Sequence, residues 1–134
     1  MNIPVKFNGP YSVTINATDY GVVNSLASKE FFIKYLVCQR AYLNDLLHLN
    51  RVVTLNDVYK RLRMEETENG NLIGWSLDNP NSDRYVDFDL DSGKLYEFMH
   101  RDSMELTMDF NVDGQLSEDD LITHALNMQN KGEQ

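Results

Sequence analysis

The chain has 134 residues and carries 12 Lys and Arg against 21 Asp and Glu, a formal net charge of −9 at pH 7. This charge repels phosphate backbones and anionic membranes, so direct nucleic-acid binding and membrane binding are disfavoured, whereas basic partners and metal cations are favoured. Hydrophobic residues make up 42% of the chain, the composition of a folded domain rather than of a disordered segment, and we expect one domain over residues 1–134.

Cysteine usage and the N-terminus bear on the compartment of the protein. Cys38 is the single cysteine, so it forms no intramolecular disulfide, and its position after the apolar run 31–37 predicts a buried small hydrophobe. The first residues lack a charged start followed by an apolar stretch, and no apolar run reaches the roughly 20 residues that span a bilayer. We therefore expect a cytoplasmic protein.

The first half of the chain predicts a hairpin followed by two helices. Residues 1–20 alternate apolar and polar positions around an Asn-Gly-Pro turn, which is typical of a β-hairpin with one buried face. Residues 24–50 carry apolar side chains at helical spacing and further aromatics beside them, which predicts a long helix buried on more than one side. Thr54 and Asp57 have the spacing of a capping box, so a short helix is expected over residues 54–64.

The second half predicts antiparallel strands and a last helix. Within residues 71–116, the segments 71–77 and 84–90 have the composition of two strands of a second hairpin, and 84–90 alternates apolar with acidic positions. Ser117 has the position of a helix cap, and a C-terminal helix is expected over residues 117–129. The expected fold class is α+β, with antiparallel hairpins packed against one long and two shorter helices.

Residues 109–120 have the residue types and spacing of a calcium-binding loop. Side-chain oxygens stand at the first, third and fifth positions, Gly114 at the sixth, and oxygen donors at the ninth and twelfth. Oxygens on alternate residues of a tight loop converge on one ion, so Ca²⁺ is the candidate cofactor. The candidate ligands are Asp109, Asn111, Asp113, Gln115 and Asp120. An EF-hand carries Glu at the last position, and the shorter Asp120 is expected to weaken the affinity.

Two readings of this loop stay open. It resembles the calcium loops of dockerin modules, which often end in Asp and continue into a helix, although a dockerin has two such segments and this chain has one. The same residues also suit a metal-free structure, in which a Val-Asp-Gly turn ends a strand and Ser117 and Asp120 form a capping box.

Four short motifs occur in a fixed order along the chain. They are Leu-Asn-Asp-Val-Tyr at residues 55–59, Gly-Trp at 74–75, Val-Asp-Phe at 86–88 and Asp-Phe-Asn-Val-Asp-Gly at 109–114. Together they resemble an uncharacterised family of bacteria, phages and integrated mobile elements. The resemblance implies a short helix, two strands and a final hairpin turn, although this chain follows the turn with Leu-Ser-Glu-Asp-Asp-Leu rather than an apolar strand. It implies a phage or mobile-element setting and no particular activity.

The motifs of known catalytic sites are missing from the sequence. It has no nucleophile elbow, no phosphate-binding Gly-rich loop and no His or Cys spacing for a transition metal, so we expect no enzyme. We favour a non-enzymatic phage or mobile-element accessory protein that binds a basic host protein. A sharper version is an acidic DNA-mimic inhibitor of a host defence protein such as a CRISPR effector. Its candidate partner-binding residues are Asp83, Asp87, Asp89, Glu118, Asp119 and Asp120.

Two alternative functions follow from other features of the sequence. The calcium-type loop favours a small calcium-binding structural or adhesive module, in which the metal orders the loop and docks the last helix. The phage setting also allows a virion assembly or tail accessory protein that works by oligomerisation. The oligomeric state itself is left open by the sequence.

Overall fold

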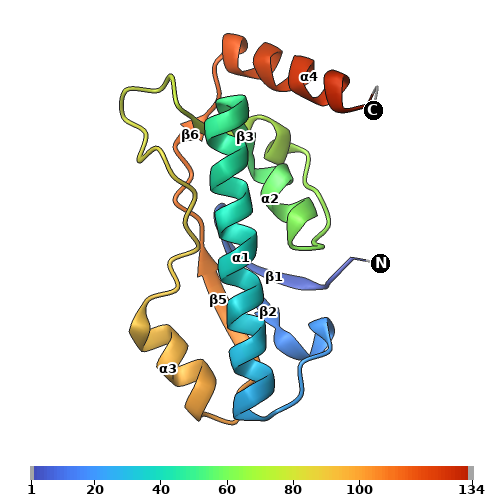
Figure 1. The fold of residues 1–134 in the computed structure, drawn as a ribbon, viewed down its shortest axis with the longest axis vertical. Helices are drawn as coiled ribbons and strands as arrows, with labels where there is room; N and C mark the ends of the chain where they lie inside the picture. The colour runs from blue at the N-terminus through green and yellow to red at the C-terminus, as the bar shows by residue number, and fades with distance from the viewer. Residues whose placement is uncertain (1, 133–134) are drawn as a thin grey trace.

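Helix α1 (Leu26–Asn50) runs along the longest axis of the molecule, and the two sheets lie behind it (Figure 1). The computed structural model describes residues 2–132. The helix begins where the Ser25 side chain accepts a hydrogen bond from the Ser28 amide, and it ends at Arg51, which takes a left-handed conformation with φ 72°. Its buried apolar side chains, spaced to form one face, are Phe32, Leu36, Leu43 and Leu47. The predicted long helix is therefore confirmed.

The first sheet contains the predicted N-terminal hairpin. Strands β1 (Val5–Gly9) and β2 (Ser12–Asn16) pair antiparallel, and β5 (Glu105–Asp109) pairs antiparallel with the other edge of β2. Alternate residues of β2, Val13 and Ile15, are fully buried, as their apolar character requires. The predicted hairpin is therefore confirmed, and it forms one sheet with β5.

The second sheet lies at the other end of the molecule. Its strand order is β3 (Val52–Thr54), β4 (Ile73–Ser76) and β6 (Gly114–Gln115), all antiparallel. A side chain at Gly74 would collide with the backbone of Val53, which explains the Gly-Trp pair in the central strand. Because β5 and β6 belong to different sheets, residues 110–113 cross between the sheets instead of forming the hairpin turn implied by the resemblance.

Two helices accompany the second sheet, and both were predicted. Helix α2 (Leu55–Arg61) begins with a complete capping box between Thr54 and Asp57. Helix α4 (Glu118–Gly132) follows Ser117, whose hydroxyl accepts a hydrogen bond from the Asp120 amide. Both helices thus begin at the residues that the capping pattern indicates.

The strand predicted over residues 84–90, and with it the second hairpin, is wrong. These residues form no ladder: Arg84 and Asp89 have positive φ values of 66° and 54°, which interrupt an extended strand at both ends. The burial pattern nevertheless follows the predicted alternation, because Val86 and Phe88 are fully buried whereas Asp89 is exposed. The apolar residues anchor the segment to the core without making it part of a sheet.

Helix α3 (Ser92–His100) was not predicted. Asp91 caps its first turn by accepting a hydrogen bond from the Lys94 amide, and Phe98 is its one buried residue. The backbone carbonyls at and after its C-terminal end accept hydrogen bonds from the side chain of Lys29 of α1, which is distant in sequence and 1% exposed. The Lys29 ammonium donates to the carbonyls of Phe98, Arg101 and Ser103 at 2.8, 2.8 and 3.1 Å. A contact between residues so far apart in sequence leaves no local signal.

The expectation that α1 is buried on more than one side is wrong for the single chain. Phe31 and Leu49 are 79% and 78% exposed, and Cys38, expected in the core, is also exposed. These side chains lie on the face of α1 that points away from the sheets. Despite this apolar surface, no helix within residues 2–132 has the length and apolar character to cross a bilayer.

Candidate functional site

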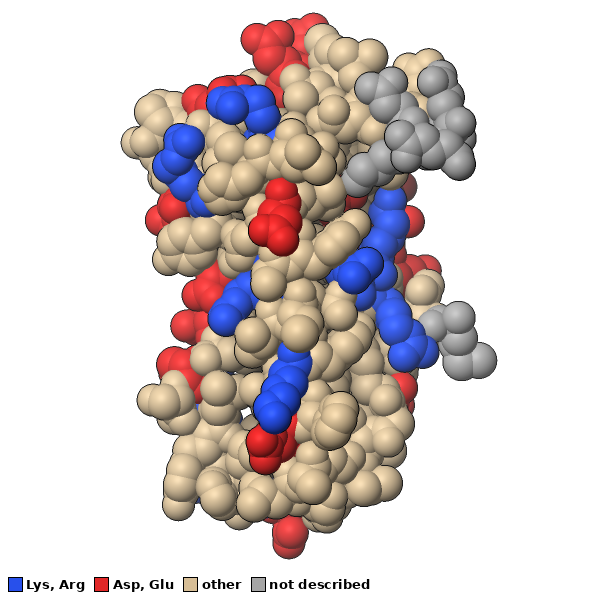
Figure 2. Space-filling view, in the orientation of Figure 1, with Lys and Arg blue, Asp and Glu red and all other residues tan. Residues whose placement is uncertain are grey.

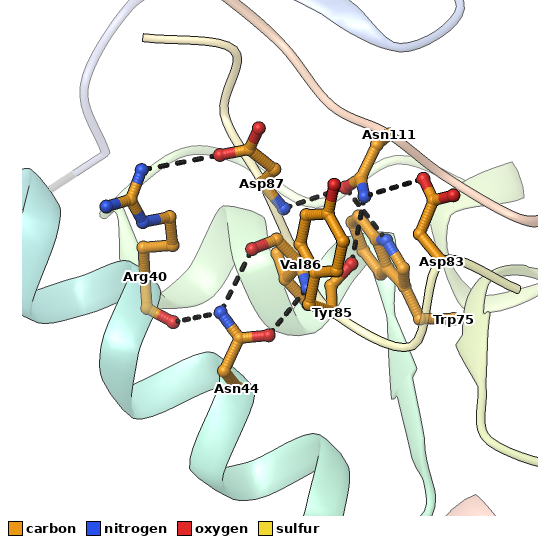
Figure 3. Close-up of polar contacts among 8 residues, drawn as sticks. All are labelled: Arg40, Asn44, Trp75, Asp83, Tyr85, Val86, Asp87 and Asn111. Carbon is orange, nitrogen blue, oxygen red and sulfur yellow. Dashed lines mark hydrogen bonds and ion pairs between the residues drawn. The ribbon is translucent and has the colours of Figure 1, made fainter.

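The surface segment 83–91 is held in place by two asparagines that belong to distant parts of the chain. The first is Asn111, whose side-chain oxygen accepts hydrogen bonds from the Trp75 indole at 3.1 Å and from the Asp87 amide at 2.7 Å (Figure 3). Its side-chain nitrogen donates to the Tyr85 carbonyl at 2.9 Å and to the Asp83 carboxylate at 3.2 Å. All the usual hydrogen-bonding positions of this amide are therefore occupied.

The second asparagine is Asn44 of α1. Its side-chain oxygen accepts from the Val86 amide at 2.6 Å, and its nitrogen donates to the Val86 carbonyl and to the Arg40 carbonyl, each at 3.0 Å. Asn44 thus replaces the neighbouring strand that the backbone of Val86 would need in a sheet. The segment keeps a defined course because side chains, rather than a ladder, satisfy its backbone.

Carboxylates project from this segment and meet cations from the helices on either side. Arg40 of α1 lies 3.3 Å from Asp87, and Lys94 of α3 lies 3.2 Å from Asp89 and 2.9 Å from Asp109. We define the acidic edge as Asp83, Asp87, Asp89 and Asp91 of this segment, Asp109 beside it, and Glu118 and Asp119 in the first turn of α4. It includes five of the six candidate partner-binding residues. Seven carboxylates against Arg40, Arg84 and Lys94 leave this edge with four net negative charges.

Hydrogen bonds shift the pKa values of Asp109 and Lys94, two residues at the acidic edge. The Ser12 hydroxyl and the Lys94 ammonium hold the pKa of Asp109 below its usual value. Burial by itself would lower the pKa of Lys94, but its hydrogen bonds with Asp109 and Asp89 outweigh this effect and raise the pKa. Both groups are therefore charged at neutral pH.

Figure 2 shows how charge is distributed over the front of the molecule. Lys and Arg side chains are spread over α1 and the side towards α2 and also lie at the upper left, whereas carboxylates follow the left edge below them, where the chain between β4 and α3 runs in Figure 1. The charges that sum to −9 are thus unevenly distributed over the surface. The acidic edge is a separate surface from the front of α1.

Asp120, the sixth candidate partner-binding residue, differs from the others. It is 8% exposed, and its two carboxylate oxygens accept from the Ser76 hydroxyl at 2.8 Å and from the Ser117 amide at 3.2 Å. With the return bond from the Asp120 amide to Ser117, this is the capping box of the metal-free reading. We therefore leave Asp120 out of the surface proposed below.

The candidate calcium ligands are engaged with separate protein donors. Asp109 binds Lys94, Asn111 binds the segment described above, and Asp113 accepts from the Ser76 amide at 3.0 Å. Gln115 lies apart, in an open groove of about 700 Å³ whose apolar lining comes from the first hairpin, α2 and the start of β4. Within residues 2–132, no three His, Cys, Asp or Glu side chains are grouped so as to hold a metal ion. The donors that engage these side chains favour the metal-free reading, and a calcium titration tests it.

Sequence reasoning missed three residues that shape this site and assigned a different role to a fourth. Arg40, Asn44 and Lys94 reach it from helices, and the amide of Asn111 organises it without any metal. The signal at Asn111 was present in the loop motif but pointed to a different chemistry. The other three carry no local pattern, because their partners are far away in the sequence.

The comparisons with known proteins identify a family but no activity. A family model described as a family of unknown function, DUF6353, matches residues 16–119. This range includes α1, both asparagines and the whole acidic edge. No curated protein and no solved structure matches the chain.

Proposed function

The chain belongs to DUF6353, a family of unknown function. From the chemistry of its surface, we propose that it is a non-enzymatic protein that binds a basic macromolecular partner through the acidic edge. The observation that carries this proposal is the pinning of segment 83–91 by Asn44 and Asn111. Carboxylates on a held backbone lose less conformational entropy on binding than carboxylates on a free loop.

The charge of the edge supports a basic partner in particular. The residues of the acidic edge carry four net negative charges, and long-range attraction between opposite charges accelerates encounter and selects orientation. Arg40 and Lys94 neutralise part of the edge, and as solvent-accessible ion pairs they contribute little to stability, so a partner cation can exchange with them at small cost.

The finer proposal places the protein in a phage or mobile element as a DNA-mimic inhibitor of a host defence protein such as a CRISPR effector. The resemblance to mobile-element proteins and the row of carboxylates support it. A DNA-binding channel of such an effector is lined with Lys and Arg that normally contact phosphates. Carboxylates held at the acidic edge would occupy those contacts.

The test is displacement of DNA from a guide-loaded CRISPR effector. A fluorescently labelled target duplex is bound to the effector, and anisotropy is followed as the protein is added at increasing salt. We expect release of the duplex at micromolar protein, with weaker release at high salt because exposed charges are screened.

Two triple variants of equal charge separate the acidic edge from general acidity. Asp83→Asn with Glu118→Gln and Asp119→Asn removes three charges from the edge, and Asp19→Asn with Asp102→Asn and Glu105→Gln removes three exposed charges elsewhere. We expect the edge variant to need at least about tenfold more protein and the control to stay within about twofold. Equal losses, or no displacement by the unaltered protein, would exclude the DNA-mimic proposal.

A further inference from the structure

The face of α1 that points away from the sheets is a continuous, mostly apolar stripe. Its positions recur every three or four residues opposite the buried face, so they form one ridge along a helix about 37 Å long. From one end to the other, the stripe contains Phe31, Lys34, Cys38, Ala41, Asp45 and Leu49, all exposed. Figure 1 shows α1 in front of the sheets, and because the stripe residues are exposed, this ridge is open to a partner.

Along the stripe, the residue types follow the same order from either end, and the two charges have opposite signs. Phe31 and Leu49 are the large apolar residues near its ends, Lys34 and Asp45 are the opposite charges inside them, and the small residues Cys38 and Ala41 lie at the middle. Each pair is centred on, or within half a residue of, the point between Gln39 and Arg40. A surface that contacts an identical copy across a two-fold axis must be self-complementary in this way.

We infer that α1 is the interface of a homodimer, in which the α1 helices of two copies pack antiparallel about a two-fold axis between Gln39 and Arg40. Phe31 of each copy then meets Leu49 of the other, and Lys34 of each copy meets Asp45 of the other. The small side chains of Cys38 and Ala41 at the centre allow the two helices to approach closely.

Charge complementarity selects this arrangement over others. A parallel pair of helices would put Lys34 against Lys34 and Asp45 against Asp45, and like charges in contact oppose association. Lys34 lies 3.3 Å from Glu30 of its own helix, but both side chains are more than half exposed, so the lysine is free to share a second carboxylate. The dimer does not depend on the proposed function, because the acidic edge is a different surface.

Charge reversal tests the geometry directly. The dimer dissociation constant is measured by sedimentation velocity for the unaltered protein, Lys34→Asp, Asp45→Lys and the double variant, with Lys6→Asp on exposed β1 as the control. Each single reversal creates two like-charge contacts, so we expect the constant to rise at least about tenfold. The double variant restores opposite charges and should return to within about threefold.

The native cysteine supplies a second, independent readout. In the antiparallel arrangement the two Cys38 residues are offset by only about 4.5 Å along the helix axes, so a short bismaleimide should join them. We expect covalent dimer from the unaltered protein and much less from Lys34→Asp at the same concentration. All substitutions are at exposed positions, and circular dichroism will confirm that the variants are folded.

Three results would overturn the inference. The first is a strict monomer at all concentrations, which would leave the face to a different partner. The second is a dimer that the single reversals do not weaken, and the third is a double variant that stays as weak as the single ones. The last two would place the interface elsewhere on the molecule.

Discussion

Asn111 shows how one residue type serves two different chemistries. As the third position of a calcium-type loop, its side-chain oxygen would bind a cation, and a carboxylate would serve there equally well. In the structure the same residue uses its nitrogen as well, donating to the Tyr85 carbonyl and the Asp83 carboxylate. A substitution that keeps the side-chain oxygen and replaces the nitrogen therefore distinguishes the two roles.

We predict that Asn111→Asp destabilises the protein by about 1–3 kcal/mol, because a carboxylate oxygen would face the Tyr85 carbonyl and the Asp83 carboxylate without a donor. Thermal melting should show a fall of about 4–10 °C. Calcium should restore none of this fall and should not raise the melting temperature of the unaltered protein.

The control for this substitution is Asn81→Asp, the same chemical change at an exposed position, which should leave the melting temperature nearly unchanged. A calcium-dependent rise that is larger in Asn111→Asp would instead establish the loop as a metal site.

Single residues were predictable where their partners are near in sequence. The two capping boxes begin α2 and α4 as the sequence indicates, because each joins residues three positions apart. Lys29 and Asn44 could not be assigned their roles, since each acts on backbone groups tens of residues away. Cys38 was misassigned because an apolar neighbourhood in sequence does not say which face of a helix is covered.

At the scale of elements, a polar contact joins α4 to α2. The His124 imidazole lies 2.7 Å from the Asp57 carboxylate, and their side chains are 19% and 10% exposed. Burial alone would raise the pKa of Asp57, but the hydrogen bonds from His124 and the Thr54 amide, with the charges of His124 and Lys60, outweigh burial and lower it. This contact links the start of α2 to the middle of α4.

The lowered pKa of Asp57 predicts the direction of a pH effect. A carboxylate with a lower pKa in the folded than in the unfolded state stabilises the fold above the unfolded value of about 4, and this contribution is lost as pH falls through the folded pKa. His124→Ala should lower stability at pH 6–7 by about 1–2 kcal/mol. It should also reduce the loss of stability below about pH 4.

Urea unfolding at a series of pH values measures both effects, with His100→Ala as the control because His100 is exposed on α3. An unchanged pH profile in His124→Ala would show that the contact does not tune Asp57. A change of equal size in the control would show that the effect is not specific to α4.

The sequence predicted correctly the elements that are stabilised by contacts between residues near each other in the chain. The hairpin and α1 were predicted from alternation and from helical spacing, which set the buried face directly. The segment 84–90 has the same alternation but forms no ladder, because Asn44 and Asn111 take most of its backbone hydrogen bonds and β5 supplies one, from the Asp109 amide to the Phe88 carbonyl. The alternation indicates which side chains are buried, but it does not indicate which groups hydrogen-bond to the backbone.

At the scale of the whole molecule, α1 joins two sheets that do not pair with each other. One sheet holds the hairpin and β5, the other holds β3, β4 and β6, and both contribute to one buried cluster with α1. The aromatic rings of Tyr59, Phe110 and Phe88 continue this cluster from α2 to segment 83–91 by edge contacts. A shared core favours cooperative unfolding.

We predict a single unfolding transition. Trp75 is fully buried in the second sheet, so its fluorescence reports that end, whereas far-ultraviolet circular dichroism reports all helices, α3 at the opposite end included. The two midpoints in urea should coincide. A fluorescence midpoint that differs from the circular dichroism midpoint would show that the two ends unfold separately.

By itself the sequence determined the α+β class, the hairpin, the helices with local caps and the burial of alternate residues in segment 84–90, because each depends on contacts within a few residues. Tertiary structure decided the two-sheet arrangement, the support of α3 by Lys29, the pinning of the acidic edge and the open face of α1. These features depend on backbone groups and side chains that meet only after folding, and no spacing along the chain records such meetings.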